Sequence, residues 1–283
     1  MKKYSTLLIL LAFTALSAHI VAQTTGYPFV VTKSGQGKQS LLFIPGFASS
    51  GEVWKETTAK FEKDFTCYTL TMAGFAGVAS QPDPTIKKWV AGIVAYIKNN
   101  KIVQPVIIGH SMGGVMAMAI AAEYPDLPGK IIVVDALPCY SAISNTTFKP
   151  VASPDCSAML TQFKSLSNEQ FKQMQTGTMA QMVQDTSMRS RVIEWGLQSD
   201  RSTMALQFCD FLNTDLRESI SHIQCPALIL LENYFVNLKP TLEAQYRNLK
   251  TANMRYATKG LHFIMYDDKE WYFAQLTNFL QAK

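Results

Sequence analysis

The sequence predicts an α/β fold in which a mostly parallel sheet is flanked by helices. Short apolar runs, often rich in β-branched residues, alternate along the chain with longer stretches of helical spacing. The strand-like runs stay apolar over successive residues, which is typical of parallel strands covered on both faces. One long segment in the middle has no good strand signal, and we expect it to form a helical insertion.

Six predicted strands carry this alternation: 40–44, 67–71, 105–108, 131–134, 227–231 and 254–257. Four of the helices predicted between and after them are 52–63, 112–123, 242–249 and 270–280. Another helix begins after Asp83-Pro84-Thr85, and its apolar positions recur at the spacing of one helix face. Strands separated by helices in this way indicate a parallel sheet within one large domain, 23–283.

The segment from about 137 to 219 is rich in Met, Gln and Ser and follows the strand that comes after helix 112–123. Its position predicts a helical lid over one edge of the sheet. Flexible thioethers around an apolar cleft would suit a hydrophobic substrate, although most of these residues are expected simply to pack the lid onto the body.

The first 22 residues are predicted to be a signal peptide. Lys2 and Lys3 precede an apolar run from Leu7 to Ala18, and the small residue Ala22 offers a cleavage position. The run is shorter than the ~20 residues that cross a bilayer, which argues against a stable membrane anchor. We therefore expect an exported protein, either periplasmic or secreted.

Composition excludes some partners. Only 17% of the 283 residues are charged, the formal net charge is +5, and the cations are scattered, so nucleic acid is not expected to bind. The five cysteines lack metal-ligand spacing, and neither a metal nor another cofactor is predicted. Cys67 and Cys225 are expected in the core, whereas Cys139, Cys156 and Cys209 share the middle segment and allow one disulfide there.

The motif Gly109-His110-Ser111-Met112-Gly113 lies between an apolar strand and a helix. This is the setting in which G-x-S-x-G forms a nucleophile elbow, a sharp turn that exposes the serine oxygen above the sheet. Glycines flank Ser111 because a Cβ would collide in so tight a turn. The free N–H groups of the following helix favour a developing oxyanion. Ser111 is therefore the predicted nucleophile.

The base follows by elimination among four histidines. His19 lies in the predicted leader, and His110 is fixed within the elbow. His222 precedes a strand and should lie at the amino edge of the sheet, away from the carboxyl edge where sites of such sheets gather. His262 follows the last strand and is the predicted general base.

These motifs resemble the α/β-hydrolase superfamily over nearly all of the chain after the leader. The run LLFIPGF is similar to that family's oxyanion strand, GHSMGG to its elbow, and GLHFIMYD to its histidine loop. The resemblance implies an α/β-hydrolase fold and an oxyanion hole formed by the backbone N–H groups of Phe47 and Met112.

The acid of the triad is where the chain departs from the family. Most relatives have an aspartate about four residues past the strand ALILL, and this chain has Phe235 there. Asp135 ends the strand 131–134 at the productive edge and is the predicted acid, because it could hold the imidazole of His262. Glu232, a residue of the lid, or no acid at all remain alternatives. Asp267 and Asp268 are predicted to cap the last helix.

The predicted function is hydrolysis of carboxylic esters or amides of apolar acyl groups through an acyl-enzyme, as in carboxylesterases. Acyl transfer, lyase or perhydrolase chemistry on the same residues is the alternative within this fold. A binding protein without turnover is a third possibility, which the missing acid makes conceivable. The sequence leaves the natural substrate and the oligomeric state open.

Overall fold

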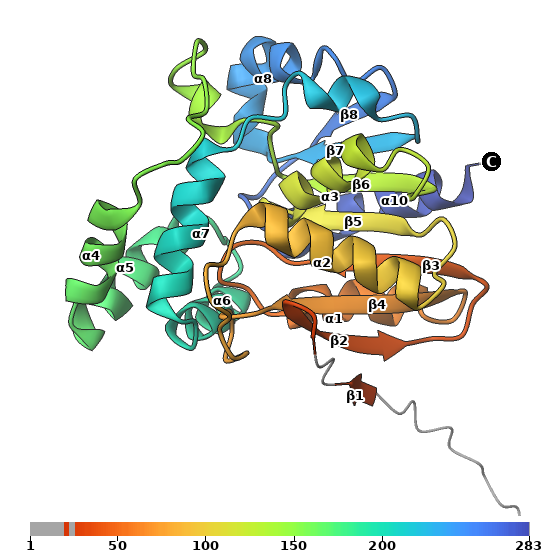
Figure 1. Ribbon diagram of the computed structural model, residues 1–283. Coiled ribbons are helices and arrows are strands. Elements are labelled where there is room, and N and C mark those ends of the chain that lie inside the picture. The colour runs from red at the N-terminus through yellow and green to blue at the C-terminus, as the bar shows by residue number, and fades with distance from the viewer. Residues whose placement is uncertain (1–19, 23–25, 283) are drawn as a thin grey trace, which may run out of the picture.

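The computed structural model describes residues 20–22 and 26–282, which form a twisted sheet with helices on both faces (Figure 1). The strand order is β1-β2-β4-β3-β5-β6-β7-β8. The strands are β1 (Ile20–Ala22), β2 (Phe29–Ser34), β3 (Gln39–Ile44), β4 (Phe65–Met72), β5 (Val106–His110), β6 (Lys130–Val134), β7 (Ala227–Leu231) and β8 (Ala252–Tyr256).

All six predicted strands are present, as β3 to β8, and all pairings among these six are parallel. The mostly parallel α/β fold is therefore confirmed. Strands β1 and β2 extend the sheet in antiparallel fashion and were not predicted. In β2 only Phe29 and Val31 are buried, so its apolar signal is weak, as befits a strand near a sheet edge.

Two helical layers cover the sheet, and the strands contribute buried side chains to the core on both faces. Leu42 and Ile44 of β3 belong to one buried cluster with α2 and α3, whereas Leu41 and Phe43 belong to the opposite cluster with α1 and α10. This two-sided burial explains why the strands are apolar at every position. The covering helices are α1 (Lys55–Phe61), α2 (Ile86–Asn99), α3 (Met112–Glu123), α8 (Lys239–Tyr246), α9 (Ile264–Asp267) and α10 (Lys269–Gln281).

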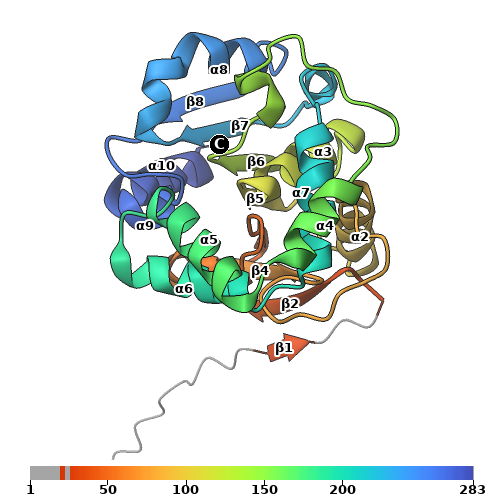
Figure 2. The same cartoon turned by 90° about the vertical axis from the view of Figure 1, so that its left-hand side faces the viewer.

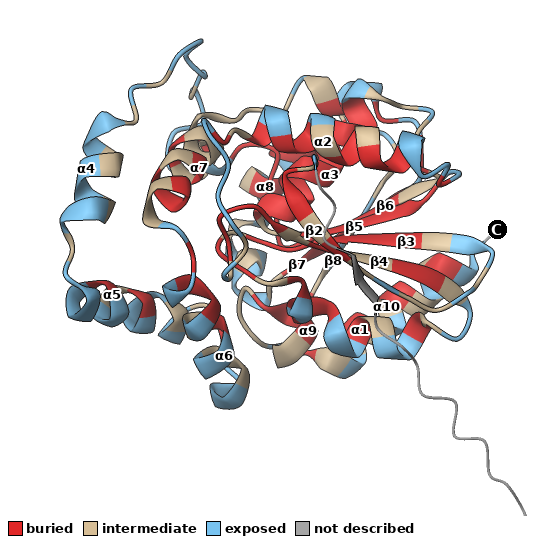
Figure 3. Ribbon diagram, turned by 60° about the horizontal axis from the view of Figure 1, so that its bottom comes forward, coloured by how far each residue is buried: buried red, intermediate tan, exposed pale blue. Residues whose placement is uncertain are grey.

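The segment between β6 and β7 is helical, as predicted, and we call residues 137–219 the insert. It contains α4 (Ser157–Ser165), α5 (Asn168–Ala180), α6 (Thr186–Leu197) and α7 (Arg201–Asn213). Figure 2 shows these helices in front of the sheet, beyond the ends of its strands. Helix α4 has no buried residue, and Figure 3 shows how much of α4 and α5 is exposed. The insert is thus held to the body mainly through α6, α7 and their loops.

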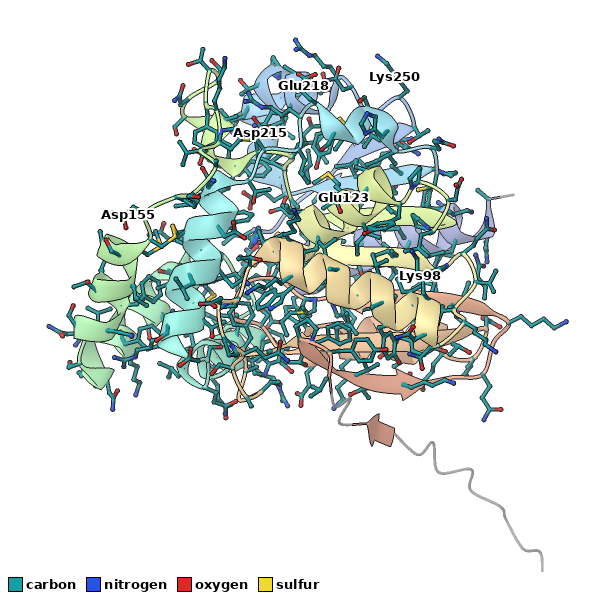
Figure 4. The ribbon with its side chains drawn as sticks, viewed as in Figure 1. Lys98, Glu123, Asp155, Asp215, Glu218 and Lys250 are labelled. Atoms are coloured by element: carbon teal, nitrogen blue, oxygen red, sulfur yellow. A yellow bond between two sulfur atoms is a disulfide. The ribbon has the colours of Figure 1, made fainter. Side chains whose placement is uncertain are left out.

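A disulfide between Cys156 and Cys209 joins the start of α4 to α7 (Figure 4). The third cysteine of this region, Cys139, is free and buried, as are Cys67 and Cys225. The bridge closes a loop of 53 residues that includes most of the four helices, and it ties α4, which has no buried residue, to α7. It therefore replaces packing that α4 lacks.

We expect Cys209→Ser to lower the free energy of unfolding by roughly 2–4 kcal/mol, because a loop of this length loses considerable entropy when it is closed. Thermal unfolding with and without a reductant measures the effect. Reductant should destabilise the wild type and leave Cys209→Ser unaffected. Equal melting temperatures for both oxidised proteins would contradict the expectation.

Some boundaries and roles differ from the predictions. Helix α8 begins at Lys239, three residues before the predicted start, since Pro240 is favourable in a first helical turn. Asp267 and Asp268 do not cap α10 with their side chains, and both instead accept hydrogen bonds from loops. The predicted leader lies mainly in residues 1–19, outside the described part. Within the described part, no helix is long and apolar enough to span a membrane.

Candidate active site

Ser111 lies on the turn between β5 and α3, with a backbone φ of 53°. This left-handed conformation is rare for a residue with a side chain and lifts the serine away from the sheet. A Cβ on Gly109 would come within 2.1 Å of the Gly113 carbonyl oxygen, and one on Gly113 within 2.3 Å of the Ile44 oxygen. Only glycine fits these positions, which explains the motif.

His262 lies in the loop between β8 and α9, and its ring is held by Asp135. The Nδ1 of His262 is 2.6 Å from Oδ2 of Asp135. The Asp135 side chain is fully buried at the end of β6, whereas 22% of the His262 side chain remains exposed. With Nδ1 donating to Asp135, the Nε2 atom is left as a proton acceptor.

The second oxygen of Asp135 is also occupied. Its Oδ1 accepts a hydrogen bond of 2.6 Å from the backbone N–H of Glu232, the residue that follows β7. Asp135 has φ 49°, another strained backbone position. Each oxygen of Asp135 thus has a partner that follows another strand of the sheet, Glu232 after β7 and His262 after β8. These two contacts fix the orientation of the carboxylate toward His262.

Electrostatics favour the charged form of His262. Burial lowers the pKa of its imidazole, but the hydrogen bond to Asp135 and the charges of Asp135 and Glu232 outweigh that effect and leave the pKa raised. A raised pKa makes the ring a stronger base and stabilises the imidazolium that forms when it takes up a proton.

His110 contributes to the position of the histidine loop. Its Nε2 lies 3.1 Å from the carbonyl oxygen of His262, and the two rings are 4.6 Å apart. Burial and the neighbouring His262 lower the pKa of His110 well below its usual value. The neutral ring therefore donates to the loop that carries His262. The sequence placed His110 in the elbow without indicating this contact.

Ser111, His262 and Asp135 line one cavity of about 950 Å³ between the sheet edge and the insert. The cavity is also lined by Glu232 and by the two predicted oxyanion residues, Phe47 and Met112. Most remaining lining residues are thioether, aromatic or amide side chains of the insert and of 234–235, among them Met159, Phe163, Met174, Gln175, Met182, Phe208, Phe211 and Phe235.

The backbone N–H groups of Phe47 and Met112 have no acceptor among the residues that the structure describes. Phe47 follows β3, and Met112 is the first residue of α3. A Cβ on Gly46 would lie 3.1 Å from the Ser111 Cβ, so the loop after β3 approaches the elbow closely. Two unpaired donors that line the same cavity as a serine are suited to hold an oxyanion.

Asp267 links the insert to the histidine loop. Its carboxylate accepts from the N–H groups of Gln184 and Asp185 at the start of α6, and from that of Leu261, next to His262. A Cβ on Gly260 would lie 2.4 Å from the Asp267 Cβ, so only glycine allows this packing. The Asp267 side chain therefore joins the start of α6, in the insert, to the loop that carries His262.

We expect Asp267→Asn to lower kcat/KM by ~10–100-fold. The backbone N–H groups that bind Asp267 use both of its carboxylate oxygens, whereas an asparagine amide has only one oxygen to accept them. The loop that carries His262 would therefore shift. Ester hydrolysis and the rate of labelling by a fluorophosphonate measure the change. Asp267→Glu should restore part of it, and Glu270→Gln, exposed on α10, should have no effect. A melting temperature that falls without loss of labelling rate would assign Asp267 a purely structural role.

A serine at a strand-turn-helix junction, in the same cavity as a histidine–aspartate pair at the same sheet edge, defines an α/β-hydrolase architecture. Residues 41–275 match the alpha/beta hydrolase family, and the chain belongs to that family. A pimeloyl-[acyl-carrier protein] methyl ester esterase from Proteus mirabilis is 25% identical over 243 residues, which cover 83% of this chain and 90% of the relative. The same kind of enzyme from Aliivibrio fischeri is 23% identical over 68% of this chain and 73% of its own.

Solved structures agree with the fold. A hydrolase from Pseudomonas aeruginosa superposes with a TM-score of 0.78 at 13% identity, covering 95% of this chain and 99% of that one. An enol-lactonase from Burkholderia xenovorans gives 0.77 at 14% identity, with coverage of 93% and 100%. At such identities the likeness concerns the fold alone.

No group of three or more His, Cys, Asp or Glu side chains suited to a metal ion occurs in residues 20–22 and 26–282. Two contributors to the site were missed from the sequence: the contact of His110 with the histidine loop, and the tie made by Asp267. Both depend on backbone groups distant in sequence, for which side-chain motifs carry no signal.

Proposed function

We propose that this protein is a serine hydrolase that cleaves carboxylic esters through an acyl-enzyme. Ser111 attacks the ester carbonyl while His262 takes its proton, and the N–H groups of Phe47 and Met112 stabilise the oxyanion. His262 then gives the proton to the leaving alcohol. Water activated by the same histidine attacks the acyl group and releases the acid, which restores the serine.

The observation that carries the proposal is the 2.6 Å contact between His262 and Asp135 in the cavity that Ser111 lines. It supplies an acid partner for the histidine where the usual aspartate of the family is replaced by Phe235. Because Asp135 orients the ring, the missing aspartate does not argue against catalysis. The named esterase relatives support ester hydrolysis in particular.

The cavity lining supports an apolar acyl group. Thioether and aromatic side chains dominate the walls that the insert provides, and flexible methionines adapt to acyl groups of different length. A volume of about 950 Å³ is sufficient for a medium-length ester. Export is part of the proposal, and the disulfide between Cys156 and Cys209 supports it because such bridges persist in oxidising compartments.

Steady hydrolysis of p-nitrophenyl esters tests the proposal. We expect continuous release of p-nitrophenol, faster for butyrate or hexanoate than for acetate. Burst release that stops after one equivalent would indicate an acyl-enzyme that requires another acceptor, as in acyl transfer. Absence of any release, with absence of fluorophosphonate labelling, would favour a binding protein.

The rate should depend on the protonation of His262. Only the neutral ring can accept the serine proton, so kcat/KM should rise with pH through the pKa of His262, which lies above the ordinary value of 6.5. Removing the Asp135 charge should move that midpoint to lower pH, since the charge favours imidazolium. A pH–rate profile of kcat/KM for the wild type and for Asp135→Asn checks this, and the same midpoint in both proteins would contradict it.

A further inference from the structure

Glu232 is a carboxylate in the cavity that the proposed reaction does not use. It follows β7 and lines the cavity together with Ser111 and His262. Asp135, not Glu232, holds the histidine, and Glu232 contributes only its backbone N–H to that arrangement. Its side chain makes no hydrogen bond or ion pair with any residue in the described part of the chain.

The rest of the cavity offers no positive charge to balance this carboxylate. Among its described lining residues there is no lysine and no arginine. The ionisable groups there are Asp135, Glu232, His262 and His110, together with the phenols of Tyr140 and Tyr234. Burial and the neighbouring His262 lower the pKa of His110 well below its usual value, so His110 is neutral and adds no positive charge. With His262 neutral, as catalysis requires, the cavity carries a net negative charge.

Aromatic side chains lie beside Glu232 in sequence and line the same cavity. Tyr234 is 64% exposed and Phe235 is partly buried. Aromatic faces attract amines and quaternary ammonium groups, and a nearby carboxylate adds to that attraction. The same surroundings repel a carboxylate on the substrate, because it would be desolvated next to a like charge.

We propose that Glu232 is a specificity residue that selects esters carrying an amine or ammonium group over uncharged and anionic esters of the same shape. This inference rests on the proposed ester hydrolysis and names its substrate class. The acyl group remains apolar, and the positive charge of the substrate takes the place of the cation that the cavity lacks.

The protonation of Glu232 makes the preference depend on pH. Burial and the nearby charge of Asp135 raise the pKa of the Glu232 carboxyl to about 7, with Asp267 adding to the rise and His262 opposing it. The carboxyl is thus charged mainly above neutral pH. Preference for a cation should strengthen as the pH rises from 6 to 8.

Opposite unit charges ~6 Å apart, at an effective dielectric constant of ~20, change a binding constant by up to ~100-fold. Partial exposure of Glu232 reduces this to ~10-fold. The test compares butyrylcholine with 3,3-dimethylbutyl butyrate, in which carbon replaces the nitrogen and the shape is retained. The measured quantity is the ratio of kcat/KM for the cationic ester to that for the uncharged one, at pH 8.

We expect Glu232→Gln to lower this ratio ~10-fold, and Glu232→Asp, which keeps the charge, to lower it less. The matched control is Glu123→Gln, an exposed glutamate at the far end of α3 (Figure 4). It should leave the ratio unchanged. At pH 6 the difference between wild type and Glu232→Gln should shrink.

A ratio in Glu232→Gln within twofold of wild type overturns the inference. So does a wild type that prefers the uncharged ester tenfold, a result that requires no variant. If the wild type hydrolyses neither ester and also releases no p-nitrophenol from p-nitrophenyl butyrate, the hydrolase proposal itself fails. Calorimetric binding of choline and 3,3-dimethylbutan-1-ol to wild type and Glu232→Gln then decides the inference, and equal affinities of choline for both proteins contradict it.

Discussion

Ser111→Ala is expected to abolish ester hydrolysis, with a fall in kcat of at least ~10⁴-fold. The residual rate would come from the oxyanion donors and substrate binding alone, as in serine proteases from which the nucleophile has been removed. KM should change little, because the side chain is small and makes its essential bond only during reaction. Steady-state kinetics with p-nitrophenyl butyrate measure both constants.

The matched control is Ser190→Ala, an exposed serine of α6 that should leave kcat unchanged. The positive φ at Ser111 is a strained position for alanine and serine alike, so the fold should be retained. Circular dichroism and the melting temperature verify this. A Ser111→Ala protein that keeps even a tenth of the wild-type kcat would require another nucleophile.

Asp135→Asn is expected to lower kcat by ~10³–10⁴-fold with little change in fold. The oxygen of the asparagine can still accept the N–H of Glu232, which turns its amide nitrogen toward Nδ1 of His262. That nitrogen donates a hydrogen bond, so Nδ1 must become the acceptor and Nε2 carries the proton. In this tautomer the histidine cannot accept the serine proton.

Measurement of kcat together with the rate of fluorophosphonate labelling should show both falling in parallel. Asp135→Ala provides a comparison. Alanine makes no hydrogen bond to Nδ1, so it does not impose the wrong tautomer on His262, but it leaves a small gap beside the imidazole ring. Near-normal activity in Asp135→Asn would show that Asp135 is not the acid of the triad and would make Glu232 the next candidate.

The sequence predicted the central strands and helices well because their local signals agree with their surroundings. Helix α3 was predicted to the residue, and so was β7, since each is apolar throughout and ends at a turn or polar residue. Strand β2 was missed because its apolar run, from Phe29 to Val31, is only three residues long. The start of α8 was misplaced because Pro240 was not taken as a first-turn signal.

The site was predictable where topology constrains it. Ser111 and His262 each follow a parallel strand, and the carboxyl ends of such strands meet at one edge. Asp135 and Glu232 both satisfy that criterion, on neighbouring strands, so sequence position alone could not separate them. Their side chains differ in direction: one reaches Nδ1, and the other faces the cavity.

Contacts across long sequence distances could not be predicted in the same way. Asp267 binds backbone N–H groups more than 80 residues away, and such donors are present in every residue type except proline. The pairing of Cys156 with Cys209, with Cys139 left free, depends on how α4 lies against α7. In both cases the relevant information is the tertiary position of the insert.

We infer that the Ser111 hydroxyl is activated as a nucleophile by the His262–Asp135 pair. Intact-protein mass spectrometry after treatment with a fluorophosphonate, followed by peptide mapping, tests it most directly. We expect one adduct per chain, located on Ser111, formed rapidly in the wild type and very slowly in Asp135→Asn. An adduct on another residue, or no adduct on the folded wild type, would contradict it.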